Sequence, residues 1–307
     1  MHKNKYRIKY NGDSMGNNET PLIDGSDVAI NSSCAAARFV NLGARPSLKG
    51  AALSGFDLIY GKNIDQKIHP ASIVKLLTCM VLIDIQNDLD DQFEICSKDK
   101  ATGSGNNLIS GDIITFRDAL YNMLLPSSNV TAKAISRAIG EKILGARIAN
   151  PRMAFVNKMN SKAREIGLKN SNFTNAAGIR NEKMYSTADD LSLLGISALH
   201  YPDILKAWGA SSHVIKVEGG NPREIEVKST LKNIADSDIL GGKTGTLNGD
   251  AKTRNLITLV AMPSKNYAVL LTAGGEIDKH RYRDTRKIIN YIKKHVRWPI
   301  GSILDNA

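Results

Sequence analysis

Long apolar runs, paired cysteines and aromatic residues are all scarce in this sequence of 307 residues. No stretch approaches the roughly 18 consecutive apolar residues that a membrane-spanning helix needs. Three cysteines, Cys34, Cys79 and Cys96, are too few for a disulfide framework, and they show no Cys-x-x-Cys spacing. The six histidines include no His-Glu-x-x-His pattern. We therefore expect no transmembrane span, no metal and no cofactor.

The first 27 residues lack the apolar core of a secretory signal peptide. They are polar and basic near the start, and no run of about 7–15 apolar residues follows. We expect residues 1–27 to be a disordered or loosely tethered segment. At the other end, residues 298–307 are expected to form a tail.

The charge balance is basic, with 41 Lys and Arg against 30 Asp and Glu and a formal net charge of +11. Such a surface favours anionic partners, among them nucleic acid, anionic lipid and acidic wall polymers, although a solvated lysine-rich surface gives the same balance. Aromatic residues are only 6% of the chain. No basic run is interleaved with them, as a single-strand binder would require. We expect no nucleic-acid partner.

Hydrophobic periodicity predicts helices between two groups of strands. The expected helices are 73–85, 116–125, 130–143, 153–166, 188–199 and 282–296, with a Gly-, Ser- and Asn-rich loop over 97–112. The expected strand pairs are 51–53 with 58–60, 214–217 with 224–227, and 256–262 with 267–272. This order predicts an α/β (α+β) fold, with an antiparallel sheet flanked by helices and an inserted, mostly helical subdomain at about 85–205.

A lysine inside an apolar helix is the first chemical signal. Lys75 lies in the middle of Ile73-Val74-Lys75-Leu76-Leu77, where burial would lower the pKa of the amine and make it a base. Ser72 precedes it by three residues, so both side chains share one helical face. Ser72 also lies near the helix N-terminus, whose free N–H groups can stabilise an oxyanion. The pair therefore has the arrangement of an activated serine nucleophile.

The spacing Ser-x-x-Lys is weak evidence alone, because it recurs at Ser97/Lys100 and Ser229/Lys232 outside apolar helices. Two further motifs follow in order. Ser127-Ser128-Asn129 comes after Leu-Leu-Pro, where Ser127 taken alone predicts a helix N-cap. Lys243-Thr244-Gly245 occurs once and, taken alone, is typical of a tight turn or of a strand that a ligand approaches closely.

Together, S-x-x-K, S-x-N and K-T-G resemble the motif set of penicillin-binding proteins and class A β-lactamases. The chain resembles the serine-type D-Ala-D-Ala carboxypeptidase family of low-molecular-mass penicillin-binding proteins. The similarity covers roughly residues 48–297, and the predicted catalytic domain spans 28–297. The segments that carry it are His69–Thr78, Gly111–Leu120, Leu124–Asn129, Ala163–Leu168, Phe173–Asn175, Gly178-Ile179 and Tyr185–Leu191.

The resemblance implies removal of the terminal D-alanine from peptidoglycan stem pentapeptides through an acyl-enzyme, with inhibition by penicillin. Ser72 would be the nucleophile and Lys75 its proton acceptor. Ser127 would shuttle the proton to the leaving D-alanine. Asn129 would bind the substrate peptide and help to place Lys75.

The same resemblance implies a carboxylate site on the Lys-Thr-Gly strand. Lys243 would supply positive charge near Ser127 and the substrate carboxylate, which Thr244 and Thr246 would bind. The backbone N–H groups of Ser72 and Thr246 would form the oxyanion hole. The expected partners are stem peptides and β-lactams, and the function implies a periplasmic or extracellular location although no signal peptide is visible.

Two departures from the family pattern affect substrate choice. Thr246-Leu247 follows Lys-Thr-Gly where relatives usually carry an aromatic residue or His and then Thr. Glu276 follows Gly274-Gly275 where relatives often carry Arg. A carboxylate there would repel the substrate C-terminus unless Arg281 or Arg283 compensates.

Two alternatives use the same fold. A class A-like β-lactamase needs a Glu-x-x-x-Asn loop to activate the deacylating water, and the nearest match, Glu165 with Asn170, is one residue too long. A non-catalytic wall-binding or penicillin-sensing module is the other, which the complete motif set disfavours and Glu276 leaves open.

The C-terminal helix is basic and amphipathic. Ile288, Ile289, Ile292 and Val296 form an apolar stripe that we expect to pack on the sheet rather than on a membrane. Contact of this helix with a membrane surface is expected to be weak.

Overall fold

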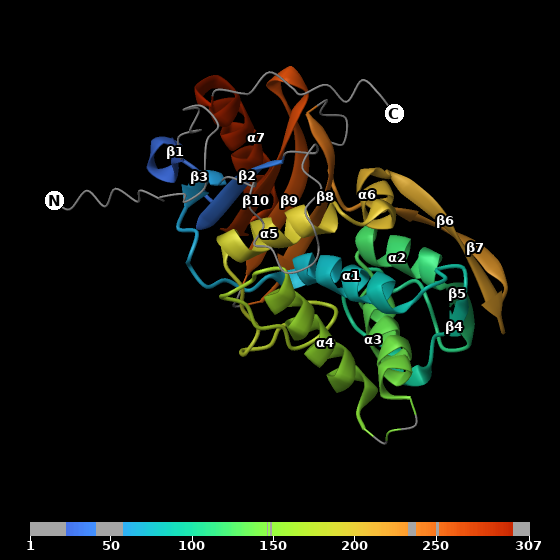
Figure 1. The fold of residues 1–307 in the computed structure, drawn as a ribbon. Helices are drawn as coiled ribbons and strands as arrows, with labels where there is room; N and C mark the ends of the chain where they lie inside the picture. Colours follow the sequence, from blue (N-terminus) through green and yellow to red (C-terminus); the bar gives the residue numbers. More distant parts are fainter. Residues whose placement is uncertain are drawn as a thin grey trace, which may run out of the picture.

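The computed structural model describes residues 23–40, 58–145, 147, 149–232, 238–249 and 252–296 (Figure 1). Ten strands are assigned within these residues: β1 Ile23–Asp24, β2 Cys34–Val40, β3 Leu58–Lys62, β4 Gln92–Glu94, β5 Asp112–Thr115, β6 Ser212–Gly219, β7 Arg223–Lys228, β8 Ile239–Leu247, β9 Thr253–Met262 and β10 Asn266–Gly275. The α-helices of the same part of the chain are α1 Lys75–Ile85, α2 Phe116–Leu124, α3 Asn129–Leu144, α4 Pro151–Glu165, α5 Ala188–Ala198, α6 Pro202–Gly209 and α7 Asp278–His295. Short 3-10 turns are η1 Gly25–Asp27, η2 Ala71–Val74, η3 Ser97–Asp99 and η4 Pro263–Lys265.

A six-stranded sheet in the order β1-β3-β2-β10-β9-β8 forms one half of the molecule (Figure 1). All of its pairings are antiparallel except β1 with β3. Helix α7 packs on β9 and β10 from one side, and α5 packs on β2 and β10. Strand β8 lies at one edge of the sheet, and η2 lies beside it.

Alternation along the central strands explains how the sheet is covered on both faces. On β10, Ala268 and Leu270 belong to one apolar cluster, whereas Val269 and Leu271 belong to another. Side chains of a strand alternate between faces, so a strand that is buried on both sides is apolar throughout. The cluster on the α7 side contains the stripe Ile288, Ile289, Ile292 and Val296. The prediction that this stripe packs on the sheet is confirmed.

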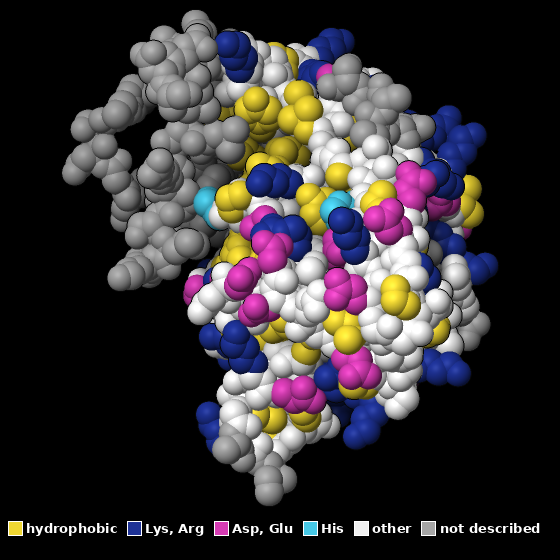
Figure 2. Space-filling view, turned by 90° about the vertical axis from the view of Figure 1, so that its right-hand side faces the viewer, with side chains coloured by type: hydrophobic (Ala, Val, Ile, Leu, Met, Phe, Trp, Pro, Cys, Tyr) yellow, Lys and Arg dark blue, Asp and Glu magenta, His cyan; other side chains and the backbone are white. Residues whose placement is uncertain are grey.

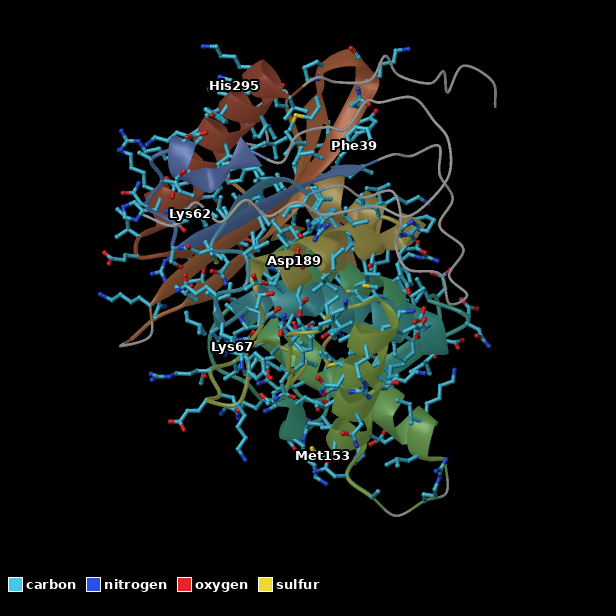
Figure 3. The ribbon with its side chains drawn as sticks, turned by 60° about the vertical axis from the view of Figure 1, so that its left-hand side comes forward. Phe39, Lys62, Lys67, Met153, Asp189 and His295 are labelled. Carbon is cyan, nitrogen blue, oxygen red and sulfur yellow. The ribbon has the colours of Figure 1, made fainter. Side chains whose placement is uncertain are left out.

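The helices α1 to α4 form the second region, below the sheet in Figure 1. Residues 75–82 of α1 are all buried, because α1 contacts η2, α2, α3, α4, α5 and α6. Figure 3 shows Met153, on α4, at the far end of this region and Asp189, on α5, between it and the sheet. Asp189 pairs with Arg38 of β2, so an ion pair joins α5 to the sheet.

The predicted helices are present with their ends shifted by no more than four residues, and Thr187 caps α5 by accepting a hydrogen bond from the Asp190 N–H at 3.2 Å. The predicted antiparallel pairs β6–β7 and β9–β10 are present as well. Strands β1, β2, β4 and β5 and helix α6 were not predicted. Residues 51–53, half of the first predicted hairpin, lie outside the described residues, and Leu58–Lys62 pairs with β1 and β2.

Two predictions about organisation are wrong. The β6–β7 hairpin does not belong to the main sheet. It extends a separate four-stranded sheet, β4-β5-β6-β7, which begins in the helical region. Residues 23–27 also do not belong to a disordered segment, because they form β1 and η1. Their partner strand, β3, follows in the chain after 33 further residues and could not be recognised from local pattern.

On the side of the molecule where β6 and β7 lie, acidic and basic side chains are interspersed over the surface (Figure 2). A mixed surface of this kind is what a solvated charged face looks like. The described residues include no helix that is long and apolar enough to cross a membrane.

Candidate active site

The first serine lies in η2, the tight turn that leads into α1. Ala71, the first residue of this turn, has a φ of +49°, a left-handed conformation that side-chain-bearing residues adopt rarely. Ser72 follows with 9% of its surface exposed, and Lys75, at the start of α1, is fully buried. The Lys75 Nζ atom lies 2.9 Å from Ser72 Oγ. The sequence prediction that these side chains share one face is confirmed.

Lys75 has two further partners, both oxygens of amide groups. Its Nζ donates to Asn129 Oδ1 at 2.9 Å and to the carbonyl of Ala177 at 2.7 Å. An ammonium group has three N–H donors, whereas a neutral amine has two donors and one lone pair. When Lys75 is neutral, the two carbonyl oxygens can take both donors. The lone pair then faces the Ser72 hydroxyl, as a proton acceptor must.

The surroundings favour that neutral form. Burial is the main cause that lowers the pKa of Lys75 well below its usual value, and the positive charge of Lys243 lowers it further. A buried amine loses the hydration that stabilises its charged form. Among the described residues, the three hydrogen-bond partners of Lys75 are neutral and no carboxylate pairs with it.

The second serine occupies a strained turn between α2 and α3. Ser127 has a φ of +65° and is 3% exposed. The helix cap is its neighbour, because Ser128 Oγ accepts a hydrogen bond from the Thr131 N–H at 3.2 Å. The interpretation of Ser127 as the N-cap is therefore wrong. Ser127 Oγ instead accepts from Lys243 Nζ at 2.8 Å, and Asn129 turns its side chain to Lys75.

Close backbone packing holds this turn against the loop before it. Asn129 Nδ2 donates to the carbonyl of Thr102 at 2.8 Å, and the Asn129 N–H donates to that of Ser104 at 3.0 Å. Gly105, with a φ of +60°, lies so close that an added Cβ would be 2.5 Å from Ser128 Cα. Gly105 thus lets the predicted loop pack directly against the second motif.

Lys243-Thr244-Gly245 lies in the middle of edge strand β8 and is not a turn. Lys243 is 1% exposed, and its Nζ also donates to the carbonyl of Thr244 at 2.9 Å. Burial lowers the pKa of Lys243 to about 7, with a smaller contribution from the charge of Arg281. At Gly245, a Cβ would stand 3.0 Å from the carbonyl oxygen of Pro70 and 3.1 Å from Ile73, so a side chain there would push β8 and η2 apart by a few tenths of an ångström.

The exposed residue Thr246 is next to a buried cation. Arg281 is 4% exposed, and its guanidinium donates to Thr246 Oγ1 at 3.0 Å and to the carbonyl of Gly245 at 3.1 Å. Thr244 Oγ1 forms a hydrogen bond of 2.7 Å with Thr230 Oγ1. Arg281 also pairs with Asp278. Arg281 thus adds a second cation, besides Lys243, next to this strand.

Sequence reasoning missed several groups at the site. Nothing in the sequence marked the Ala177 carbonyl as part of the site. Its neighbour Gly178 was a possible sign of close backbone packing, and in the structure a Cβ there would be 2.0 Å from the Ala71 carbonyl oxygen. Asn255 on β9 was not recognised. The other two Ser-x-x-Lys spacings are elsewhere: Ser97 lies in η3, and Ser229 Oγ accepts from the Leu231 N–H.

The fold and the paired serines and lysines define the class: this is the fold of penicillin-binding proteins and the related β-lactamases. A family model described as D-alanyl-D-alanine carboxypeptidase matches residues 54–273. The chain belongs to the D-alanyl-D-alanine carboxypeptidase family.

Among curated relatives, the D-alanyl-D-alanine carboxypeptidase DacF of Bacillus subtilis is 26% identical over 239 residues, which are 76% of this chain and 58% of DacF. A D-alanyl-D-alanine endopeptidase of Pseudomonas aeruginosa is 30% identical over 156 residues, 50% of this chain and 47% of the relative. The chain therefore spans about half the length of these two relatives. The crystal structure of the Streptomyces K15 DD-transpeptidase matches with a TM-score of 0.74 and 25% identity, over 86% of this chain and 97% of that one.

Proposed function

We propose that the protein is a serine-type D-Ala-D-Ala carboxypeptidase that removes the terminal D-alanine from peptidoglycan stem pentapeptides and is acylated by penicillin. One observation carries the proposal: Lys75 is fully buried, its hydrogen-bond partners among the described residues are neutral, and its Nζ lies 2.9 Å from the hydroxyl oxygen of Ser72. A serine at a helix start beside a lysine with a lowered pKa is an activated nucleophile. Family membership supplies the substrate class.

In the proposed acylation, Ser72 Oγ attacks the carbonyl carbon between the two D-alanines and passes its proton to neutral Lys75. The N–H groups of Ser72 and Thr246 stabilise the oxyanion. Ser127, held 2.8 Å from Lys243, passes its hydroxyl proton to the departing amine and takes up in return the proton that Lys75 received from Ser72. The C–N bond breaks, free D-alanine leaves, and the acyl group remains on Ser72. Water then hydrolyses this ester and regenerates the serine.

Recognition of the terminal carboxylate is assigned to Thr244, Thr246 and the charges of Lys243 and Arg281. The bond from Arg281 to Thr246 Oγ1 supports this assignment, because a buried guanidinium orients the hydroxyl and adds positive charge behind it. Glu276, the suspected source of repulsion, is exposed. The carboxylate that pairs with Arg281 is Asp278 instead.

The reaction should be tested with purified protein and diacetyl-Lys-D-Ala-D-Ala, by measuring release of D-alanine. We expect release by the parent chain and none by Ser72→Ala. A matched control is Ser97→Ala, which removes the serine of another Ser-x-x-Lys spacing and should leave release unchanged. Release that persists in Ser72→Ala would exclude the proposed nucleophile.

A second candidate concerns the bond that is cleaved rather than the site. Relatives of this chain include proteins named D-alanyl-D-alanine endopeptidase. An endopeptidase uses the same acyl-enzyme but releases a cross-linked peptide as the leaving amine. Incubation with cross-linked muropeptides, followed by chromatography of the products, separates the two activities.

A β-lactamase has less support. Glu165, the nearest candidate for a deacylating base, ends α4 and pairs with Lys162 at 3.1 Å. Rapid hydrolysis of nitrocefin would favour a β-lactamase, whereas slow acylation without turnover favours the carboxypeptidase. A substrate in peptidoglycan further implies that the protein acts outside the cytoplasmic membrane, in the periplasm or at the cell surface.

A further inference from the structure

The turn that carries Ser72 is held from below by a side chain of the main sheet. Asn255, on β9, is completely buried. Its Nδ2 donates to the carbonyl oxygens of His69 at 3.0 Å and Pro70 at 3.1 Å. Both N–H bonds of this amide therefore end on the two residues that lead into the strained residue Ala71.

The other half of the Asn255 amide is equally occupied. Its Oδ1 accepts from Thr253 Oγ1 at 2.9 Å and from the backbone N–H of Gly274 at 3.1 Å. A side-chain amide offers two donors and two acceptor sites, and here all four are used. Rotating the amide by a half turn would place oxygen against two carbonyls and nitrogen against an N–H donor, so its orientation is fixed by its partners.

His69 holds the same turn from within. Its Nδ1 accepts a hydrogen bond from the Ala71 N–H at 3.0 Å. Burial, together with the charge of Arg180, lowers the pKa of His69 to about 4, so the ring is neutral at working pH and can accept. The backbone around the left-handed Ala71 is thus fixed by three hydrogen bonds. His69 Nδ1 accepts one from the Ala71 N–H, and Asn255 Nδ2 donates the other two to the carbonyls of the two preceding residues.

Asn255 lies between this turn and strand β8, which carries Thr246. Asn255 is paired directly with Gly245 of β8, and the space that a Gly245 side chain would fill is closed by the Pro70 carbonyl, Ile73 and Asn255 itself. Ser72 is two residues beyond Pro70, and Thr246 is one beyond Gly245. The side chain of Asn255 is therefore bonded to the turn that carries Ser72, and its backbone is paired with the residue before Thr246, so Asn255 lies between the two proposed oxyanion-hole N–H groups.

We propose that Asn255 and His69 are positioning residues which together set the distance and direction between the Ser72 and Thr246 N–H groups. This inference rests on the proposed function. Neither residue touches the reacting atoms. They act through the turn, since an oxyanion hole stabilises the transition state only when its donors are preorganised. A displacement of about 1 Å is enough to cost about 100-fold in rate.

The test is the acylation of the purified full chain by benzylpenicillin, analysed for two constants: the dissociation constant of the noncovalent complex and the first-order rate constant of acylation. We expect Asn255→Ala to lower the rate constant by about 100-fold and to leave the dissociation constant unchanged. Thr258→Val is the matched control. It removes a buried hydroxyl from the same strand, whose bond to the Leu270 carbonyl is 3.4 Å long, and should leave both constants unchanged.

A second pair of variants keeps the proposal testable if Asn255→Ala does not fold. His69→Ala removes the acceptor and should lower the acylation rate constant by about tenfold, whereas His69→Asn restores an acceptor that can bond the N–H two residues on and should recover most of the rate. A merely structural role would lower the melting temperature of these variants without this rescue. A normal rate constant in Asn255→Ala, or equal rates in the two His69 variants, would overturn the proposal. If the unmodified chain is not acylated at all, the proposed function itself fails, and the inference fails with it.

Discussion

Ser72 and Lys75 lie three residues apart on one helical turn, whereas Ser127 and Lys243 lie 116 residues apart and meet between a helix turn and a sheet edge. The first pair is made by local geometry, because residues three apart in a helix share a face. The second pair exists only after the helical region has packed against β8. The comparison teaches that one site can combine a robust local pair with a pair that depends on the whole fold.

The two lysines also differ in the charge that their proposed roles require. Lys75 is surrounded by neutral oxygens and has a pKa lowered by burial and by Lys243, which suits a base. Lys243 has a pKa lowered to about 7 by burial and by Arg281, so its charge can be present while Lys75 is neutral. Because the charge of one amine changes the pKa of the other, the two titrate as a coupled system. Their different surroundings favour a different charge on each, as their proposed roles require.

The largest expected effect comes from Lys75→Arg. Arginine keeps its proton at every working pH, so the variant should fold and yet lose acylation by benzylpenicillin by about two to four orders of magnitude, the usual contribution of a general base. Rapid-mixing kinetics measures the loss, with circular dichroism as the control for folding. Near-normal acylation in the folded variant would contradict the role of Lys75.

The same change in the second pair should have a smaller effect. Lys243→Arg retains the positive charge, and its main cost is the larger guanidinium in a buried site, for which we expect a loss of about tenfold at pH 7. The parent should lose acylation as pH rises through about 7, where Lys243 loses its proton, and the variant should lack this decline. Acylation rates measured from pH 6 to 9 give the comparison, and identical alkaline limbs in both proteins would argue against a charged Lys243.

Stability should depend on pH through the same lysine. The pKa of Lys243 is about 7 in the folded chain and 10.5 in its ordinary state, so the unfolded chain binds more protons between these values. The free energy of unfolding should therefore rise with pH in this window, by at most about 1.4 kcal/mol per pH unit for this group. Urea unfolding from pH 7 to 10 tests this, with Lys243→Met as the reference that lacks the contribution. A slope shared by both proteins would show that Lys243 is not the group responsible.

The smallest effect is expected at Glu276, outside both pairs. Because Arg281 already supplies the cation beside Thr246 and Glu276 is exposed, Glu276→Arg should change kcat/KM for D-Ala-D-Ala peptides by less than about twofold; an exposed charge contributes little in water. Steady-state kinetics at matched ionic strength decides this. A clear fall in KM would instead place Glu276 close to the substrate carboxylate.

The extent to which the sequence predicted the site follows the same division. Ser72 and Lys75 could be recognised because an apolar helix containing one lysine is unusual in itself. Ser127 could not be recognised locally, since serines at 127 and 128 both look like helix caps and only packing distinguishes them. Arg281 was named, with Arg283, only as a compensation for Glu276, and its bond to Thr246 could not be predicted because it depends on how α7 begins after β10.

Fold prediction failed where the pattern was weak or the partner distant. Strand β2 contains three consecutive alanines, which have low strand propensity, and forms a strand because it pairs with β3 and β10. Helix α6 has only eight residues. The β6–β7 hairpin was recognised, but its sheet was misassigned, since the alternation of a strand does not say which neighbour it joins.

The most direct test of the account is the site of acylation by benzylpenicillin. Intact-mass analysis of the purified chain should show one penicilloyl adduct, and peptide mapping should place it on Ser72, the serine whose oxygen lies 2.9 Å from Lys75. Ser72→Ala should show none. An adduct that survives this substitution, or that maps to Ser97, Ser127 or Ser229, would contradict the assignment of Ser72 and Lys75 as the reacting pair.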